Sequence, residues 1–197
     1  MENMIRGHLV LIMAPMASGK GVLLSHITQH YPEVKRLVSC TTRAKRPGEV
    51  EGKDYFFISR DQFEQKTQAG EFLEWAEFSD NLYGTLKSQL LANLENGNVT
   101  INEIDLHGVR SILSLIPKEY CTVVYINAGD WETLKARALS RAPMSERELA
   151  LRHIHYLEEM TYKDSADFIV DNDDLQLEEA KRKLSTIVES IISHTHT

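Results

Sequence analysis

Residues 8–27 constrain the fold more than any other part of the sequence. A largely apolar run at residues 8–13 is followed by a loop of mainly small residues at 14–21, and then by apolar residues at helical spacing as far as Ile27. A short run of branched apolar residues is typical of a strand buried on both faces, and the spacing after the loop is typical of a helix. The segment therefore predicts a strand, a tight loop and a helix, the unit from which parallel α/β folds are built.

The rest of the chain repeats this alternation. Further strands are predicted at residues 97–105, 121–126 and 168–170. Helices are predicted at residues 85–94, 106–116, 131–140, 146–163 and 177–191. Because strands and helices alternate, we expect a three-layer α/β/α fold with a parallel central sheet.

Residues 37–84 break this rhythm. Short extended pieces surround an Arg-Pro-Gly turn at residues 46–48, which predicts a small β-rich lobe inserted after the first helix. We therefore expect a single domain with three parts. These are a core (1–36, 86–130 and 158–197), the inserted lobe (37–85) and a small helical lid (131–157).

Composition narrows the classes of protein that need to be considered. The chain has 22 basic and 29 acidic residues, a net charge of −7, which argues against a protein that coats nucleic acid or an anionic membrane by bulk charge. We expect no signal peptide and no membrane span, and we expect two reduced thiols at Cys40 and Cys121, so the predicted location is the cytoplasm. Both a monomer and a homodimer remain open. Five basic residues and no acidic one lie between positions 35 and 46, which indicates a local anion site.

The loop at residues 14–21 is placed where a phosphate-binding loop belongs. In such loops backbone N–H groups and a helix N-terminus surround the phosphates, and a lysine adds positive charge. Gly19 and Lys20 match the core of this pattern, whereas Ala14 and Ala17 stand where glycine is usual. Gly21 removes the hydroxyl that normally reaches Mg²⁺, and Ser18 is the only hydroxyl nearby. Alone, the loop would also fit an ordinary strand–helix turn.

Two carboxylates end the second predicted strand. Glu103 and Asp105 lie where acidic residues can hold magnesium through water, but no direct metal ligand is predicted. Asp105 could equally cap the helix that follows it.

The inserted lobe carries a second set of phosphate donors. Arg43 and Arg46 can each fork onto phosphate oxygens, and the hydroxyl groups of Ser39 and Tyr55 add neutral donors. Farther along, Glu74 and Thr85 offer a carboxylate and a small hydroxyl, a combination that suits the donor edge of guanine. Trp75, between them in sequence, is expected to be a core residue.

Taken together, these motifs resemble those of a guanylate kinase, a P-loop kinase of nucleoside monophosphates. The Ser39–Phe57 motif, Glu74-Trp-Ala, Tyr83-Gly-Thr85 and Glu103-Ile-Asp105 occur in the family's order and spacing, and the resemblance runs from residue 14 to the Asn-Asp-Asp segment at 172–174. It implies that the GMP phosphate is held by Ser39, Arg43, Arg46, Tyr55 and Tyr83, and guanine by Glu74, Thr85 and Asp105. It implies that ATP is bound by Ala14, Pro15, Met16, Ala17, Ser18, Gly19, Lys20, Gly21 and Val22. It further implies that Lys20, Arg137, Arg141 and Arg152 are catalytic, and that Asn172 supplies a closing contact around the nucleotides.

Each of these residues also has a plainer interpretation. Tyr55 and Tyr83 could be packing aromatics, and Arg137 and Arg152 could be solvated helix charges. The ordered set favours phosphoryl transfer from ATP, with Mg²⁺, to GMP and dGMP. The alternatives are a nucleotide-binding or regulatory protein with weak or no activity, because of the altered loop, and a kinase for another phosphorylated acceptor.

Overall fold

The computed structural model describes residues 5–78, 80–173 and 176–195. Its strands are β1 (His8–Met13), β2 (Lys35–Arg36), β3 (Cys40–Thr41), β4 (Phe56–Phe57), β5 (Phe72–Phe78), β6 (Asn81–Leu86), β7 (Val99–Ile104), β8 (Cys121–Asn127) and β9 (Phe168–Asp171). Its α-helices are α1 (Lys20–His30), α2 (Arg60–Gln68), α3 (Lys87–Glu95), α4 (Leu106–Leu115), α5 (Trp131–Arg141), α6 (Glu146–Met160) and α7 (Leu177–Thr195). Two 3₁₀ turns lie at Lys118–Tyr120 and Lys163–Ser165.

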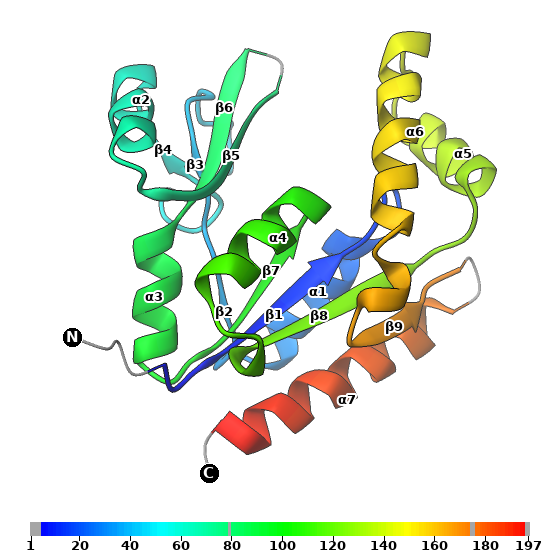
Figure 1. Cartoon of the computed structure of the whole chain (residues 1–197). Helices are drawn as coiled ribbons and strands as arrows, with labels where there is room; N and C mark the ends of the chain where they lie inside the picture. The colour runs from blue at the N-terminus through cyan, green and yellow to red at the C-terminus, as the bar shows by residue number, and fades with distance from the viewer. Residues whose placement is uncertain (1–4, 79, 174–175, 196–197) are drawn as a thin grey trace.

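A parallel five-stranded sheet forms the centre of the molecule, in the order β2-β7-β1-β8-β9. Side chains alternate along the central strand β1, so Leu9 and Leu11 pack against α3 and α4, whereas Val10 and Ile12 pack against α1 and α7. Helices thus cover both faces of the sheet (Figure 1). The predicted three-layer α/β fold with a parallel central sheet is confirmed.

A second sheet, in the order β4-β3-β6-β5, stands at one side of the central sheet (Figure 1). It contains the extended pieces expected in the lobe, but the lobe also includes α2, which was not predicted. Only Phe63 of α2 is buried, so the sequence shows no amphipathic stripe there. The helix is fixed locally by a capping box, in which Gln62 N donates to Ser59 Oγ (3.1 Å) and Ser59 N donates to Gln62 Oε1 (2.9 Å).

Two further differences from the sequence predictions have physical causes. Thr85 was predicted to begin a helix, but it belongs to β6 because it pairs with Glu74 of β5, and α3 begins only at Lys87. Strand β2 was not predicted, because its two residues are basic and exposed and carry no apolar signal.

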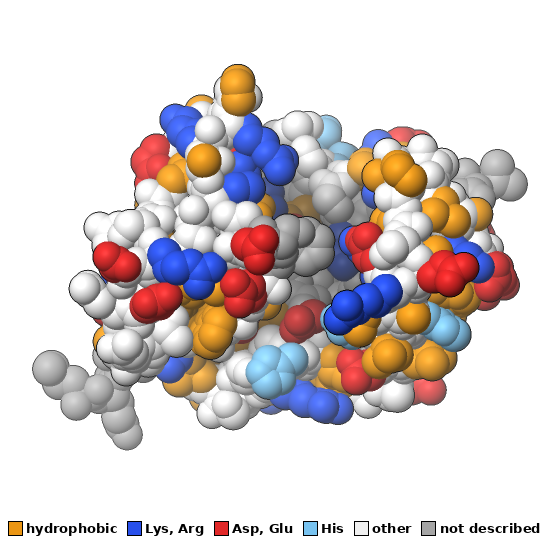
Figure 2. Space-filling model, turned by 90° about the horizontal axis from the view of Figure 1, so that it is seen from above, with side chains coloured by type: hydrophobic (Ala, Val, Ile, Leu, Met, Phe, Trp, Pro, Cys, Tyr) orange, Lys and Arg blue, Asp and Glu red, His pale blue; other side chains and the backbone are white. Residues whose placement is uncertain are grey.

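Helices α5 and α6 stand across from the second sheet, on the other side of the carboxyl ends of the central strands (Figure 1). Seen from above, the molecule is hollowed between these two parts, with charged side chains around the hollow (Figure 2). Both cysteines are buried and free. None of the helices in the described part of the chain combines the length and the apolar character needed to cross a membrane.

Candidate active site

The loop between β1 and α1 presents its backbone toward a ligand. Gly19 precedes α1 in the left-handed conformation (φ 87°), no side chain caps the helix, and its first turn carries no acidic residue. No side chain therefore competes with an anion for the N–H groups at the start of this helix. Ser18 is 1% exposed, and among the described residues its Oγ is a buried atom without a hydrogen-bond partner. A bound phosphate would give that hydroxyl a partner, which fits the prediction that this loop holds nucleotide phosphates.

The alanine and glycine departures in the loop have local consequences. Ala17 adopts φ 56°, in the left-handed region that disfavours a residue with a Cβ atom. Gly21 is exposed in the first turn of α1 and offers no side-chain ligand. Lys20 turns back on the loop, with its Nζ donating to Ala14 O.

Asn172 ties this loop to the end of β9. Its Nδ2 donates to Ser18 O (2.7 Å) and its backbone N donates to Asn127 O (2.7 Å). A Cβ atom on Gly19 would lie 2.4 Å from Asn172 Nδ2, so glycine is required there for close approach as well as for its φ. Asn172 therefore stabilises the loop by linking it to the ends of β8 and β9. Asp174, in the same predicted motif, lies outside the described residues.

Two of the three arginines predicted for the lid lie near the loop. Arg152 of α6 forks onto Glu148 Oε1 (3.1 and 2.8 Å), and its NH1 lies 3.7 Å from Met16 Sδ. Arg137 of α5 is half-buried and donates to Asn172 O at 3.5 Å. Arg141 is exposed at the end of α5, and within the described part of the chain no hydrogen bond or ion pair joins it to the loop.

In the lobe, Arg43 is the centre of a cluster suited to an anion. Its guanidinium forks onto Glu49 (2.5 and 3.1 Å) and lies over the Tyr55 ring, 5.5 Å from the centroid. Tyr55 meets Tyr83 edge-on at 5.9 Å. Hydrogen bonding to Glu49 raises the pKa of Arg43, and the same contact holds the pKa of Glu49 below its usual value. Arg46 is exposed and contributes its backbone N–H to Glu49 (2.7 Å).

A second cluster joins three side chains from neighbouring strands of the lobe. Thr85 Oγ1 donates to Glu74 Oε1 (2.7 Å), and Ser39 Oγ lies 3.1 Å from Thr85 Oγ1. Burial raises the pKa of the Glu74 carboxyl and Asp105 adds to this, while the Thr85 hydrogen bond opposes it. The structure thus brings together Glu74 and Thr85, two of the three residues predicted to hold guanine, and it places Ser39 with them.

A cavity of about 230 Å³ connects the lobe with the loop. It is lined by Lys20, Glu74, Glu103, Ile104, Asp105 and Glu159. Asp105 Oδ1 accepts from Gly108 N (2.7 Å), so the helix cap considered as an alternative is present, on a residue that also lines the cavity. Glu103 is exposed and pairs with Arg36 at 3.4 Å.

Two carboxylates of these clusters were not assigned a role from the sequence. Glu49 lies six residues after Arg43, beyond a Pro-Gly turn, and only the turn's geometry brings their side chains together. Glu159 comes from the far end of α6, and no sequence spacing links it to Lys20. The prediction that Trp75 is a core residue is wrong, because the residue is 50% exposed. It lies on β5, an edge strand, and contacts Phe63 edge-on at 6.4 Å.

Magnesium was considered as an ion held through water. The described residues contain no group of three His, Cys, Asp or Glu side chains arranged as a metal site. The cavity nevertheless places the oxygen donors of Glu103 and Asp105 beside Lys20, and carboxylate oxygens are donors that Mg²⁺ prefers. These two residues would hold a hydrated ion through water, and Gly21 offers no direct ligand.

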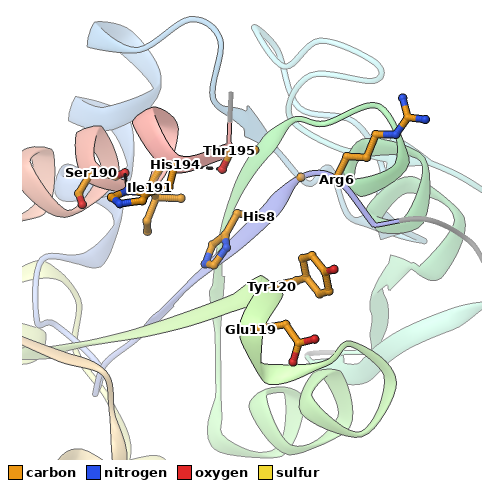
Figure 3. Close-up of a pocket in the computed structure, with 9 residues that line it drawn as sticks. Arg6, His8, Glu119, Tyr120, Ser190, Ile191, His194 and Thr195 are labelled. Carbon is orange, nitrogen blue, oxygen red and sulfur yellow. Dashed lines mark hydrogen bonds between the residues drawn. The ribbon is translucent and has the colours of Figure 1, made fainter. Parts of the chain in front are cut away.

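A cavity of about 370 Å³ lies at the opposite end of β1 (Figure 3). There His8 Nε2 lies 2.8 Å from Thr122 Oγ1 and His194 Nδ1 lies 2.6 Å from Ser190 O, so these polar groups are satisfied within the protein. In Figure 3 the Arg6 side chain extends away from the other labelled side chains. This cavity shares no residue with the clusters described above.

Comparisons with known proteins match most of the chain. The guanylate kinase family model matches residues 6–191. The chain is 39% identical to a guanylate kinase of Trichormus variabilis, over 89% of this chain and 87% of that protein. It is 37% identical to a guanylate kinase of Rubrobacter xylanophilus, over 96% and 97% respectively. The crystal structure of guanylate kinase from Anaplasma phagocytophilum is similar with a TM-score of 0.66 and 28% identity, covering 93% of this chain and 85% of that one.

Proposed function

Because the chain belongs to the guanylate kinase family, we propose that it transfers the γ-phosphoryl group of ATP to GMP and dGMP, giving ADP and the nucleoside diphosphate. The observation that carries this proposal is the cavity in which Lys20 of the phosphate loop and Glu74 of the lobe face the same space. A donor nucleotide on the loop and a guanine nucleotide in the lobe would meet there.

In this proposal the lobe selects and orients GMP. Arg43, Tyr55 and Tyr83 bind its phosphate, with Arg46 at the exposed rim, and charge-assisted forks hold such groups strongly. Glu74 accepts hydrogen bonds from the guanine N1–H and 2-amino group, and Asp105 completes this edge.

The loop and the α5–α6 pair supply the charge that phosphoryl transfer requires. Lys20 and the backbone N–H groups around Gly19 hold the ATP phosphates, and Arg137, Arg141 and Arg152 approach them when α5 and α6 act as a lid. Mg²⁺ carried with ATP neutralises charge on the donor phosphates when it is bound. The acceptor phosphate is already an oxyanion, so no protein base is needed, and lid closure keeps water from the reaction.

The three-part division into core, lobe and lid belongs to this proposal, as does a cytoplasmic location, which the two free thiols support. A coupled assay of ATP consumption with Mg²⁺ and GMP, AMP, CMP or UMP tests the activity. We expect stimulation by GMP far above that by the other three. Equal stimulation by all four would contradict guanine selectivity. Tight GMP binding without ATP binding would instead favour a binding protein.

A further inference from the structure

Helix α6 carries an apolar stripe that no other element covers in the described part of the chain. Leu151, Ile154 and Leu157, which we call the α6 stripe, are 52%, 52% and 53% exposed, and none of them packs against a hydrophobic cluster of the described residues. Because they are three residues apart, they lie within about 120° of one another around the helix. None of the 15 described residues of α6 is buried. A helix of this length gains most of its stability by packing an apolar face, so the stripe needs a cover.

The other two faces of α6 already contact the protein. His153 approaches Trp131 of α5, with the ring centroids 4.5 Å apart. Arg152 faces the phosphate loop, where its NH1 lies 3.7 Å from Met16 Sδ. Ile154 follows Arg152 by two residues, a rotation of about 200° around the helix axis. The α6 stripe therefore lies on the side of α6 away from the loop, and a cover there would leave the candidate active site open (Figure 1).

Opposite charges flank the α6 stripe. Arg147 precedes Leu151 by four residues, Glu158 follows Ile154 by four residues, and both charged side chains are exposed. Neither of them forms an ion pair with another described residue. The spacings of four, three and four residues keep these side chains on one face, and they are the spacings by which paired helices contact each other. The face thus runs from an unpaired cation, through apolar residues, to an unpaired anion.

We propose that the α6 stripe and its two flanking charges form an interface between two copies of this chain, whose α6 helices pack antiparallel about a two-fold axis. With Ile154 at the axis, Leu151 of one copy packs against Leu157 of the other, once on each side of the axis. Arg147 of one copy then lies within one helical turn of Glu158 of the other. The face is therefore its own complement in shape and charge, whereas parallel packing would bring like charges together. Because both copies use the same patch, the assembly closes at two chains.

Sedimentation equilibrium of the full chain from about 1 to 100 μM tests the proposal. We expect a reversible dimer with a dissociation constant of about 10 μM, because one helix face is a small interface. Ile154→Glu is expected to raise this constant at least about tenfold, since it places two like charges at the axis. A chain that stays monomeric throughout, an assembly larger than two, or a dimer insensitive to Ile154→Glu would overturn the proposal.

Leu115→Glu is the matched control. Leu115 is 43% exposed on α4, so the substitution places the same charge on an exposed apolar position outside the α6 stripe. It is expected to keep the wild-type dissociation constant. Circular dichroism and thermal unfolding of both variants check the fold, which we expect to be retained because both side chains are exposed in the single chain. Equal weakening of the dimer by both substitutions would place the interface elsewhere and overturn the proposal.

Charge reversal tests the antiparallel arrangement itself. Arg147→Glu alone and Glu158→Arg alone are each expected to raise the dissociation constant about fivefold, because each brings like charges together at both ends of the interface. Arg147→Glu combined with Glu158→Arg restores the attraction with the signs exchanged, so the constant is expected to return to within about twofold of the wild type. If the combined variant were weaker than either single variant, the two charges would not meet across the dimer, and the antiparallel interface would be overturned.

Discussion

At the scale of single residues, Ala17 stores strain in the phosphate loop. Its φ of 56° places a Cβ atom in the left-handed region, which costs about 1–2 kcal/mol. Glycine would remove that strain, although its greater freedom in the unfolded chain offsets about 0.4–1 kcal/mol of the gain. We expect Ala17→Gly to raise the free energy of unfolding by about 0.5–1 kcal/mol, measured by urea denaturation.

Ala14→Gly is the matched control in the same loop. Ala14 is fully buried, and its φ is not positive. Glycine at this position would therefore relieve no backbone strain, but it would remove the packing of a methyl group and increase the conformational entropy of the unfolded chain. It is expected to lower the free energy of unfolding by about 1 kcal/mol. If both substitutions destabilised the protein equally, the backbone of Ala17 would not be strained in solution.

Most candidate site residues could be predicted from the sequence, but their partners could not. The residue types of the lobe motifs indicate phosphate and guanine binding, as at Arg43, Tyr55, Glu74 and Thr85. That Ser39 contacts Thr85 depends on the register between β3 and β6, which a sequence pattern does not contain. Likewise, only the folded loop shows that the Ser18 hydroxyl is buried without a hydrogen-bond partner.

At the scale of elements, helices and strands with a long apolar pattern could be predicted from the sequence, whereas short elements made mainly of polar residues could not. Strands β1 and β8 and helix α4 have buried faces that show in the sequence, and the structure places them within a few residues of the predicted bounds. Strand β2 is held by pairing with β7, and helix α2 by its capping box. Neither needs an apolar pattern, so periodicity could not reveal them.

Asp105 caps α4 and is also proposed to bind guanine, and two substitutions can separate these roles. Its Oδ1 caps α4, and the residue also lines the cavity. Asparagine caps helices as well as aspartate does, but its amide N–H₂ group would face the guanine donors, which need an acceptor. We therefore expect Asp105→Asn to keep wild-type stability while raising the GMP KM about fivefold or more.

Asp105→Ala should show both losses, with the free energy of unfolding lowered by about 1 kcal/mol. Denaturation and steady-state kinetics of the two variants provide the measurement. Wild-type GMP kinetics in Asp105→Asn would mean that the residue serves α4 alone.

At the scale of the whole molecule, Glu159 lies where α6, the loop and the central sheet meet. It lines the cavity with Lys20 and Asp105. Burial raises the pKa of its carboxyl to about 7, with Asp105 and Glu158 acting in the same direction and Lys20 opposing them. Above pH 7 the folded protein therefore carries a charge that burial disfavours.

The sign of the resulting pH dependence follows from proton counting. Between the ordinary carboxyl pKa of 4.5 and about 7, the unfolded chain has released the Glu159 proton while the folded protein keeps it. Folding therefore takes up a proton in this window, and stability falls as the pH rises through it. The full shift corresponds to about 3 kcal/mol, and the partial exposure of the side chain reduces this to about 2 kcal/mol.

Glu159→Gln removes this titration, so its stability relative to the wild type should increase by about 2 kcal/mol between pH 4.5 and pH 8. Urea denaturation at several pH values measures the difference, and comparing the two ends of the range cancels any constant cost of burying an amide. Glu146→Gln, at the exposed start of the same helix, reports the effect of losing a surface carboxylate. If the Glu159→Gln and wild-type curves stayed parallel across the window, the carboxylate would be ionised without cost, and the junction of α6 with the loop would be open to water.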